Sequence, residues 1–319
     1  MSLLQATGIE VRYPVKTGVL QRPTGWIRAV DGVDVALDAG ETLGLVGESG
    51  SGKSTLGRAL IMLRRPDEGS IRFAGQDILA LDAAGLKALR RKLQIVFQDP
   101  NASLDPRRTV GGSVRMGLDL HRIGSRAERA AAVERMFHRV GLRPEHMARF
   151  PHEFSGGQRQ RIGIARALIL SPDLLVCDEA VSALDVSVQA QILNLLKDLQ
   201  AERGLAMLFI SHNLAVVEHM ADRIAVMYAG RIVEEAPRDA LFAAPRHPYT
   251  RTLLDAVPTP DPTRRDPHPP PLGEPPDPAN LPTGCRFRSR CPIAMTRCAE
   301  DEPALAEIAT AHRAACWAA

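Results

Sequence analysis

A glycine-rich segment with one lysine and a final serine could bind phosphate; it reads Gly47-Glu48-Ser49-Gly50-Ser51-Gly52-Lys53-Ser54. Glycines let the backbone turn so that successive N–H groups point at phosphate oxygens, beside the positive end of a following helix. Lys53 can reach β- and γ-phosphates, and the Ser54 hydroxyl can bind Mg²⁺. The spacing matches the P-loop pattern in full. We therefore expect a triphosphate to be bound by Gly47, Ser49, Gly50, Gly52, Lys53, Ser54 and Thr55.

Two carboxylates follow an apolar run, in Leu174-Leu175-Val176-Cys177-Asp178-Glu179. Asp178, at the expected end of a strand, suits a magnesium ligand acting through water. Glu179 is placed to polarise an attacking water as a general base. Acidic residues commonly end strands, so this pair alone is weak evidence. With a P-loop upstream, it indicates nucleoside triphosphate hydrolysis.

A second candidate anion site follows Phe154 and reads Ser155-Gly156-Gly157-Gln158, at the start of a helical pattern. One triphosphate does not need two such sites on one chain. This segment resembles the signature sequence of ABC (ATP-binding cassette) ATPases. The resemblance implies a head-to-tail dimer in which these four residues face the γ-phosphate of the ATP held by the opposite subunit.

Further positions resemble landmarks of that family. Gln98 resembles the glutamine that senses the γ-phosphate and Mg²⁺, and Asp185 belongs to the loop Ser182-Ala183-Leu184-Asp185 that crosses the dimer interface. His212 resembles the switch histidine, although a lone histidine after a strand is usually only a satisfied polar residue. The resemblance thus gives Lys53, Gln98, Glu179 and His212 as catalytic residues and Ser54, Gln98 and Asp178 as magnesium ligands. Tyr13 is the expected adenine platform, with Trp26 as the alternative.

Apolar runs and helical patterns alternate along the chain. Residues 28–46 predict strand, turn and strand, residues 53–63 a helix, and residues 125–140 a capped amphipathic helix. Further apolar runs end near Cys177 and Ile210. This alternation predicts an α/β fold with a mainly parallel sheet. The resemblance adds a P-loop NTPase core over residues 1–257, with an antiparallel β subdomain and a helical subdomain at about 105–165.

The C-terminal part has a different composition. Eleven prolines fall between Pro258 and Pro282, so residues 258–284 predict an extended linker before a cysteine-rich tail at 285–319. Its cysteines, Cys285, Cys291, Cys298 and Cys316, lack the C-x2-C pairs usual for structural zinc. Four thiolates are the ligand set of a [4Fe-4S] cluster, with Zn²⁺ or unliganded thiols as alternatives. Arg286, Arg288 and Arg290 could offset the charge of such a site.

Composition excludes several functions. Forty basic and 37 acidic residues give a formal net charge of +3, which makes no strong case for nucleic acid. No stretch of about eighteen apolar residues could span a bilayer, and no signal peptide is visible at the N-terminus. We therefore expect a cytoplasmic chain whose membrane association runs through a partner. The resemblance to ABC ATPases implies that it is attached peripherally, through permease subunits, at the cytoplasmic face of the membrane.

Three segments resemble the oligopeptide/dipeptide importer subfamily: residues 181–191, His247-Pro248-Tyr249-Thr250, and the cysteine-rich tail. The insertion before Ala29 resembles the second ATPase subunit of such systems. This implies peptide import with two integral membrane permease subunits, a paralogous ATPase subunit in a heterodimer, and an extracytoplasmic substrate-binding protein. Nickel chelates, glutathione or cell-wall peptides are alternative cargoes. ABC ATPases acting on DNA or ribosomes fit less well, because residues 54–154 hold no coiled coil and the chain holds one cassette. The signature segment, Gln98 and His212 argue against a P-loop kinase.

Overall fold

A computed structural model describes residues 2–17, 22–182, 184–256 and 273–319. It divides the chain into two compact units. The first holds residues 38–41 and 80–210, and the second holds residues 2–37, 42–79 and the described residues from 211 to 319. Ala183 and most of the predicted proline-rich linker lie outside the described residues. Across the described ranges, no helix is long and apolar enough to cross a membrane.

The first unit contains three parallel strands in the order β8-β7-β6. Their bounds are β6 (Leu93–Val96), β7 (Leu174–Asp178) and β8 (Ala206–Ile210). Every residue of β7 and β8 is buried, which is why both are continuous apolar runs without alternation. Both strands lie where the apolar runs near Cys177 and Ile210 predict them.

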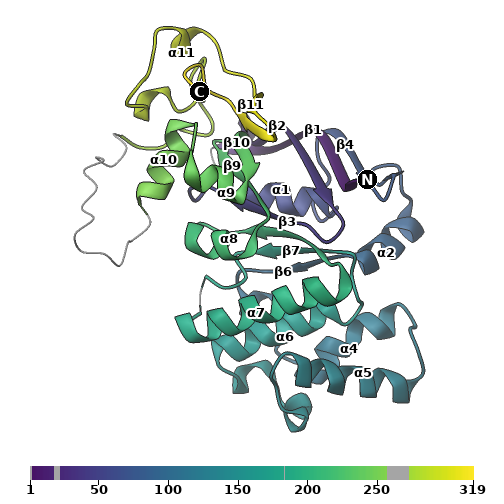
Figure 1. Cartoon of the computed structure of the whole chain (residues 1–319). Helices are drawn as coiled ribbons and strands as arrows, with labels where there is room; N and C mark the ends of the chain where they lie inside the picture. Colours follow the sequence, from purple (N-terminus) through teal and green to yellow (C-terminus); the bar gives the residue numbers. More distant parts are fainter. Residues whose placement is uncertain (1, 18–21, 183, 257–272) are drawn as a thin grey trace, which may run out of the picture. The chain divides into compact units, whose positions relative to one another are not determined.

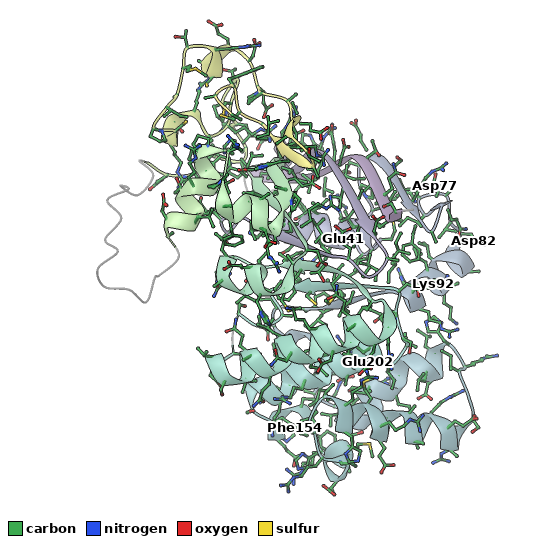
Figure 2. All side chains as sticks on the ribbon, viewed as in Figure 1. Glu41, Asp77, Asp82, Lys92, Phe154 and Glu202 are labelled. Carbon is green, nitrogen blue, oxygen red and sulfur yellow. The ribbon has the colours of Figure 1, made fainter. Side chains whose placement is uncertain are left out.

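Helices make up the rest of the first unit (Figure 1). They are α2 (Ala83–Lys92), α3 (Pro100–Ser103), α4 (Val110–Leu120), α5 (Arg126–Arg139), α6 (Gly156–Leu168) and α7 (Val186–Arg203), with 3-10 turns at Pro144–Ala148 and Pro151–Glu153. Helix α4 packs against both α5 and α6. The predicted cap of α5 is confirmed, because Ser125 and Glu128 form a reciprocal capping box. Asp82 likewise caps α2, whose last residue is Lys92 (Figure 2).

The second unit contains a four-stranded sheet in the order β2-β1-β4-β5. The strands are β1 (Ser2–Thr17), β2 (Arg22–Asp38), β4 (Glu68–Phe73) and β5 (Gln76–Asp77). The pairs β1–β4 and β4–β5 are antiparallel. This sheet agrees with the expected antiparallel β subdomain.

Strands β3 (Thr42–Val46) and β9 (Arg223–Tyr228) of the second unit pair in parallel. Next to β9 follow β10 (Arg231–Pro237), β12 (His312–Ala314) and β11 (Ala306–Ala309), all paired antiparallel. The strand pairing is therefore mixed and not mainly parallel as the sequence predicts. The difference arises because β9 and β10 form a hairpin and the tail adds a second hairpin to β10.

The second unit also holds the helices that surround these strands. They are α1 (Lys53–Leu60), α8 (Leu214–Met220), α9 (Arg238–Ala243), α10 (Pro248–Asp255) and α11 (Arg297–Glu300), with the 3-10 turn η3 (Arg288–Arg290). An aromatic cluster joins strand, helix and tail: Tyr228 of β9, Tyr249 of α10 and Phe287 are all fully buried, with ring centroids 4.6 to 5.4 Å apart. The tail thus shares the core of this unit.

Candidate functional site

The predicted phosphate-binding loop joins β3 to α1 in the second unit. The Lys53 ammonium is buried within it and donates hydrogen bonds to the carbonyl oxygens of Gly47 and Glu48, both at 2.7 Å, and to the Ser51 hydroxyl at 3.2 Å. Ser54 and Thr55 follow in the first turn of α1, while Ser49 and Gly50 are exposed. The loop therefore presents main-chain donors and one cation at a helix N-terminus, which suits an anionic ligand.

Two glycines of this loop have backbone conformations that other residues rarely adopt. Gly47 has a φ of 151° and Gly52, the N-cap of α1, a φ of 105°. A methyl group at Gly47 would overlap the carbonyl oxygen of Met227, and one at Gly52 would overlap that of Ala29. Glycine is therefore required at both positions by close backbone packing.

The two candidate adenine platforms lie on β1 and β2. Tyr13 is 39% exposed, and the guanidinium of Arg64 lies 5.5 Å from the centre of its ring. Trp26 is 57% exposed. Both rings are thus accessible to a planar ligand, and the choice between them stays a prediction.

In the first unit, the predicted magnesium ligand and general base stand at the end of β7. Asp178 is buried and is the last residue of this strand, in register with Ile210 of β8. Cys177, the residue before it, has its pKa raised to about 12 by burial and by Asp178, so it is a core residue and not a nucleophile. Glu179 accepts a hydrogen bond of 2.7 Å from the Gln98 side chain. The structure therefore brings together two of the predicted catalytic residues.

Glu179 has an unusual backbone conformation, with a φ of 50°. Its N–H donates to the carbonyl oxygen of Ile210, and its own carbonyl oxygen accepts from both the N–H and the hydroxyl of Ser182. A left-handed residue other than glycine is strained by about 1–3 kcal/mol and persists where surrounding bonds hold it. The hydrogen bonds to Ile210 and Ser182 therefore hold Glu179 in this conformation.

The segment Ser155-Gly156-Gly157-Gln158 begins helix α6, as predicted. Ser155 and Gln158 form a reciprocal capping box, with the Ser155 hydroxyl accepting from the Gln158 N–H at 3.3 Å. Ser155 and Gly156 are exposed, whereas Phe154 just before them is buried. Phe154 anchors the turn, so that the start of α6 faces outward.

Asp185 caps helix α7. Its carboxylate accepts hydrogen bonds from the N–H of Val188 at 2.9 Å and the hydroxyl of Ser187 at 2.8 Å, which lower its pKa. Val186, beside it, is 84% exposed. Of the predicted interface loop, only Ala183 lies outside the described residues. His212 is exposed and belongs to the second unit, just after β8.

The predicted site residues are divided between the units. The phosphate-binding loop, Tyr13 and His212 belong to the second unit, whereas Gln98, Asp178, Glu179, the Ser155–Gln158 segment and Asp185 belong to the first.

All four cysteines of the tail line one small pocket in the second unit. Burial is the main cause of the raised pKa values of Cys285 and Cys291, with smaller contributions from neighbouring cysteines. Among the described residues, no three Cys, His, Asp or Glu side chains are positioned to hold one metal ion. The predicted clustering of cysteines is therefore present, without a formed metal site.

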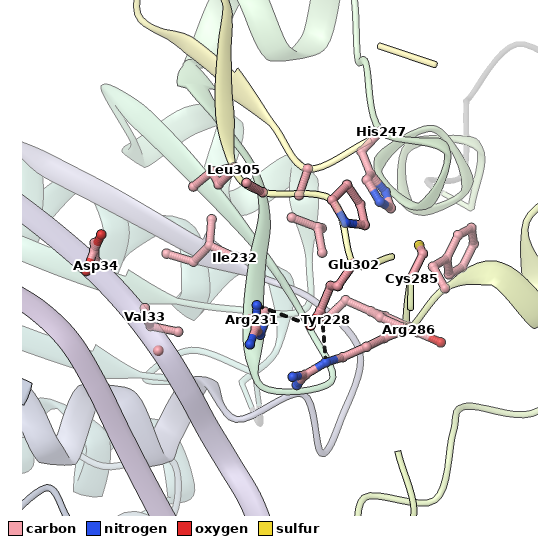
Figure 3. A pocket seen from close by; sticks show the side chains of 16 residues that line it. Val33, Asp34, Tyr228, Arg231, Ile232, His247, Cys285, Arg286, Glu302 and Leu305 are labelled. Atoms are coloured by element: carbon pink, nitrogen blue, oxygen red, sulfur yellow. Dashed lines mark ion pairs between the residues drawn. The ribbon is translucent and has the colours of Figure 1, made fainter. Parts of the chain in front are cut away.

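The tail arginines do not act as the sequence suggests. Arg286 pairs with buried Asp31 and with Glu302 at 2.9 Å, and Arg231 also pairs with Glu302 (Figure 3). Arg290 pairs with Glu48. Because their charges are matched by carboxylates, Arg286 and Arg290 serve to attach the tail, and the expectation that they offset the charge of a tetrathiolate site is corrected for these two.

Sequence reasoning missed Glu48, Tyr249 and Arg290 as residues connected to the phosphate-binding loop. Each residue lies in a segment that the sequence does single out: Glu48 in the P-loop, Tyr249 in the His247-Pro248-Tyr249-Thr250 motif, and Arg290 among the regularly spaced arginines of the tail. Nothing in their spacing indicates that they meet, because 242 positions separate Glu48 from Arg290.

Comparison with known families gives two matches. The family model described as ABC transporter matches residues 30–182. The one described as oligopeptide/dipeptide transporter, C-terminal region, matches residues 233–298, which include three of the four tail cysteines.

Curated relatives match nearly the whole chain. A putative peptide import ATP-binding protein of Brucella ovis is 49% identical, over 98% of this chain and 97% of that protein. The oligopeptide transport ATP-binding protein AppF of Bacillus subtilis is 48% identical, over 99% of this chain and 97% of that protein.

Solved structures match the cassette. The ATP-binding cassette MJ0796, as a dimer in a post-hydrolysis state bound to ADP and phosphate, aligns with a TM-score of 0.67 and 29% identity, over 74% of this chain and 98% of that chain. CbiO1 from Clostridium perfringens, part of an ABC transporter complex, gives a TM-score of 0.65 and 28% identity, over 76% and 91%.

Proposed function

The chain belongs to the ABC transporter family as an ATP-binding subunit of the peptide import type, and on that premise we propose that it hydrolyses ATP to drive import of short peptides through membrane partners. The observation that carries this proposal is the match over 98% of the chain, which covers the cassette and the C-terminal region alike. A match limited to the cassette would support ATP hydrolysis without indicating the cargo.

The predicted site residues would bind and hydrolyse ATP, each with a distinct role. In the second unit, the main-chain donors of the phosphate-binding loop and Lys53 would bind the triphosphate. Oxygen ligands suit Mg²⁺, and Ser54, Gln98 and the buried carboxylate of Asp178 would hold it. Glu179 accepts the proton of the attacking water, and its bond to Gln98 orients its carboxylate. His212 would contact the γ-phosphate.

The catalytic unit we propose is a head-to-tail dimer with a paralogous ATPase subunit. The exposed start of α6 supports this, since Gly156 lies at a helix N-terminus on the surface, where an anion on another subunit can be bound. The exposed Val186 beside Asp185 is a second candidate contact. Two permease subunits would hold this dimer at the cytoplasmic face of the membrane, with a substrate-binding protein on the other side.

The test is reconstitution of the transporter in proteoliposomes with its permease subunits and binding protein. ATP hydrolysis should rise when the binding protein is loaded with a short peptide, and labelled peptide should accumulate. Lys53→Ala should abolish both, because the ammonium that binds the phosphates is lost. Peptide-independent hydrolysis without accumulation of any short peptide would overturn the assigned cargo, while an absence of hydrolysis would overturn the ATPase.

For the tail we propose a [4Fe-4S] cluster held by Cys285, Cys291, Cys298 and Cys316, with Zn²⁺ as the alternative. The donor set supports it, because four thiols from distant positions border a single pocket. When bound, such a centre would cross-link four points of a short tail that shares its core with β9 and α10.

Anaerobic purification tests this assignment. Iron and sulfide should each approach about four per chain, with absorbance at about 400 nm, and Cys291→Ser should lower all three. Mutation of the buried Cys177 to Ser is the matched control and should leave them unchanged. A colourless wild-type protein with zinc would contradict the cluster and retain the four-cysteine site.

A further inference from the structure

One residue of the phosphate-binding loop is held by the cysteine-rich tail. Arg290, the last residue of η3, forms a two-pronged ion pair with Glu48: its Nη1 and Nη2 atoms lie 2.9 and 3.0 Å from the two carboxylate oxygens. The Arg290 side chain is 6% exposed and that of Glu48 is 29% exposed. Two parallel hydrogen bonds between a guanidinium and a carboxylate fix the relative orientation of the two groups as well as their distance.

Helix α10 holds the main chain of the same residue. The phenol oxygen of Tyr249 accepts a hydrogen bond of 2.7 Å from the N–H of Glu48. Tyr249 is fully buried against Tyr228 and Phe287, so its hydroxyl has little freedom to move. Glu48 is therefore fixed through both its side chain and its backbone, by two segments of the C-terminal region.

Glu48 is hydrogen-bonded directly to the phosphate-binding lysine, Lys53. The carbonyl oxygen of Glu48 is one of the two that accept hydrogen bonds from Lys53. A shift of Glu48 would move this acceptor, and with it the ammonium that meets the phosphates. The arrangement links Arg290 to Lys53 through one intervening residue.

Charge gives a second reason for the pairing. Glu48 places a carboxylate within the loop that receives a triphosphate, where a free negative charge would repel the ligand. Arg290 neutralises it, and Tyr228 also accepts from Arg290 at 3.4 Å. Without Arg290, the loop would keep its backbone donors but gain an uncompensated anion.

We propose that Arg290 and Tyr249 are positioning residues of the phosphate-binding loop, through which the cysteine-rich tail sets the affinity of the chain for ATP. This inference rests on the proposed ATP-binding function and adds a role for the C-terminal region. Both residues act through Glu48.

The test measures equilibrium binding of a fluorescent ATP analogue to the full chain with Mg²⁺, and kcat and KM for ATP in the assembled transporter. Arg290→Gln should weaken binding about tenfold and raise KM more than it lowers kcat. Arg290→Lys, which keeps the charge but loses the fork, should be intermediate. Tyr249→Phe should also weaken binding, because the Glu48 N–H loses its acceptor.

Two further variants separate positioning from general damage. Arg288→Gln is the matched control: Arg288 lies in the same 3-10 turn but donates to Thr283 and Ala299, so nucleotide affinity should be unchanged. The double variant Glu48→Gln/Arg290→Gln removes both charges and should regain the part of the lost affinity that is due to the uncompensated Glu48 carboxylate. Circular dichroism shows whether each variant is folded.

Each outcome bears on a distinct claim. Wild-type affinity in folded Arg290→Gln would overturn the inference and leave the ATPase intact. Equal loss in Arg288→Gln would also overturn it, since the effect would then reflect any disturbance of the tail. Failure of the double variant to recover would overturn the charge argument. A wild-type chain that binds no nucleotide would overturn the proposed function itself.

Discussion

At the scale of residues, Glu179 combines a strained backbone with a bonded carboxylate. The N–H of Glu179 donates to the carbonyl oxygen of Ile210, and the carbonyl oxygen of Glu179 accepts from Ser182. These hydrogen bonds hold the backbone at a φ of 50°. The Gln98 side-chain amide donates a hydrogen bond of 2.7 Å to one carboxylate oxygen of Glu179. This hydrogen bond from Gln98 helps to fix the direction in which the carboxylate points.

Replacement of this carboxylate tests its role as base. Glu179→Gln preserves the shape of the side chain but removes the basic oxygen, so turnover should fall by roughly a hundredfold or more. ATP binding should persist, and an ATP-bound dimer with the partner ATPase should accumulate. Hydrolysis assays and analytical ultracentrifugation measure the two effects, with exposed Glu218→Gln as the control. Unchanged turnover, or no ATP-dependent dimer, would count against the assignment.

The sequence predicts the site residues because phosphate binding needs a contiguous glycine-rich loop, and such a loop is visible in the chain order. The left-handed conformation of Glu179 is not visible, since it depends on bonds from β8 and from Ser182. The pairing of Glu48 with Arg290 is equally hidden. Contacts between distant segments follow from tertiary packing, which local patterns do not contain.

At the scale of elements, the segment after Gln98 is built around Asp105. Its carboxylate accepts from the N–H of Arg107 at 3.0 Å, which lowers the pKa of Asp105, and it also pairs with Arg108 at 3.6 Å. The Arg107 side chain also pairs with this carboxylate, at 3.5 Å, and is nevertheless 90% exposed. An ordered turn that presents an exposed cation is suited to contact another subunit, and we predict that it receives a coupling helix of the permease.

Charge reversal at this turn should separate coupling from catalysis. Arg107→Glu should leave the ATPase activity of the isolated subunit nearly unchanged and lower its stimulation in the assembled transporter about fivefold or more. Arg126→Glu, an exposed change at the start of α5, is the control. A parallel loss of both activities would instead place Arg107 in the nucleotide site.

Element prediction is reliable where local chemistry is decisive. The capping box of Ser125 and Glu128 and the apolar runs of β7 and β8 are strong signals that the structure confirms. Strand β11 gives no such signal, because all four of its residues are exposed and it lacks an apolar face. Its existence depends on pairing with β12, which no local pattern indicates.

At the scale of the whole molecule, the cysteine-rich tail is built into the second unit. Strand β12 pairs with β10, and buried His312 and Glu234 form a contact of 2.7 Å between the same strands. Arg313 pairs with Glu235 beside them. The proline-rich composition predicts a linker that separates the cassette from the tail. Composition does not predict that the chain after the linker packs back onto the second unit. The attachment of the tail is therefore seen only in the structure.

Phe287 is the apolar anchor of that attachment, and its removal should detach the tail. Its ring is fully buried against Tyr228, Tyr249 and His247. Phe287→Ala should cost about 3–5 kcal/mol of local stability, because a large cavity opens where these rings meet. We expect faster amide hydrogen exchange in β11 and β12, while helices α4 to α7 of the first unit keep their protection.

Hydrogen-exchange mass spectrometry measures both regions in one experiment. Ile293→Ala is the matched control, because Ile293 is an apolar tail residue that is 47% exposed and should lose little on truncation. Unchanged exchange in β12 of Phe287→Ala would mean that the ion pairs at Asp31 and Glu48, together with the contact between His312 and Glu234, suffice to hold the tail. Loss of protection throughout both units would instead make the tail an integral support of the entire fold. The expected local loss lies between these results, because the tail shares its core with β9 and α10 and contributes strands only at the end of the sheet.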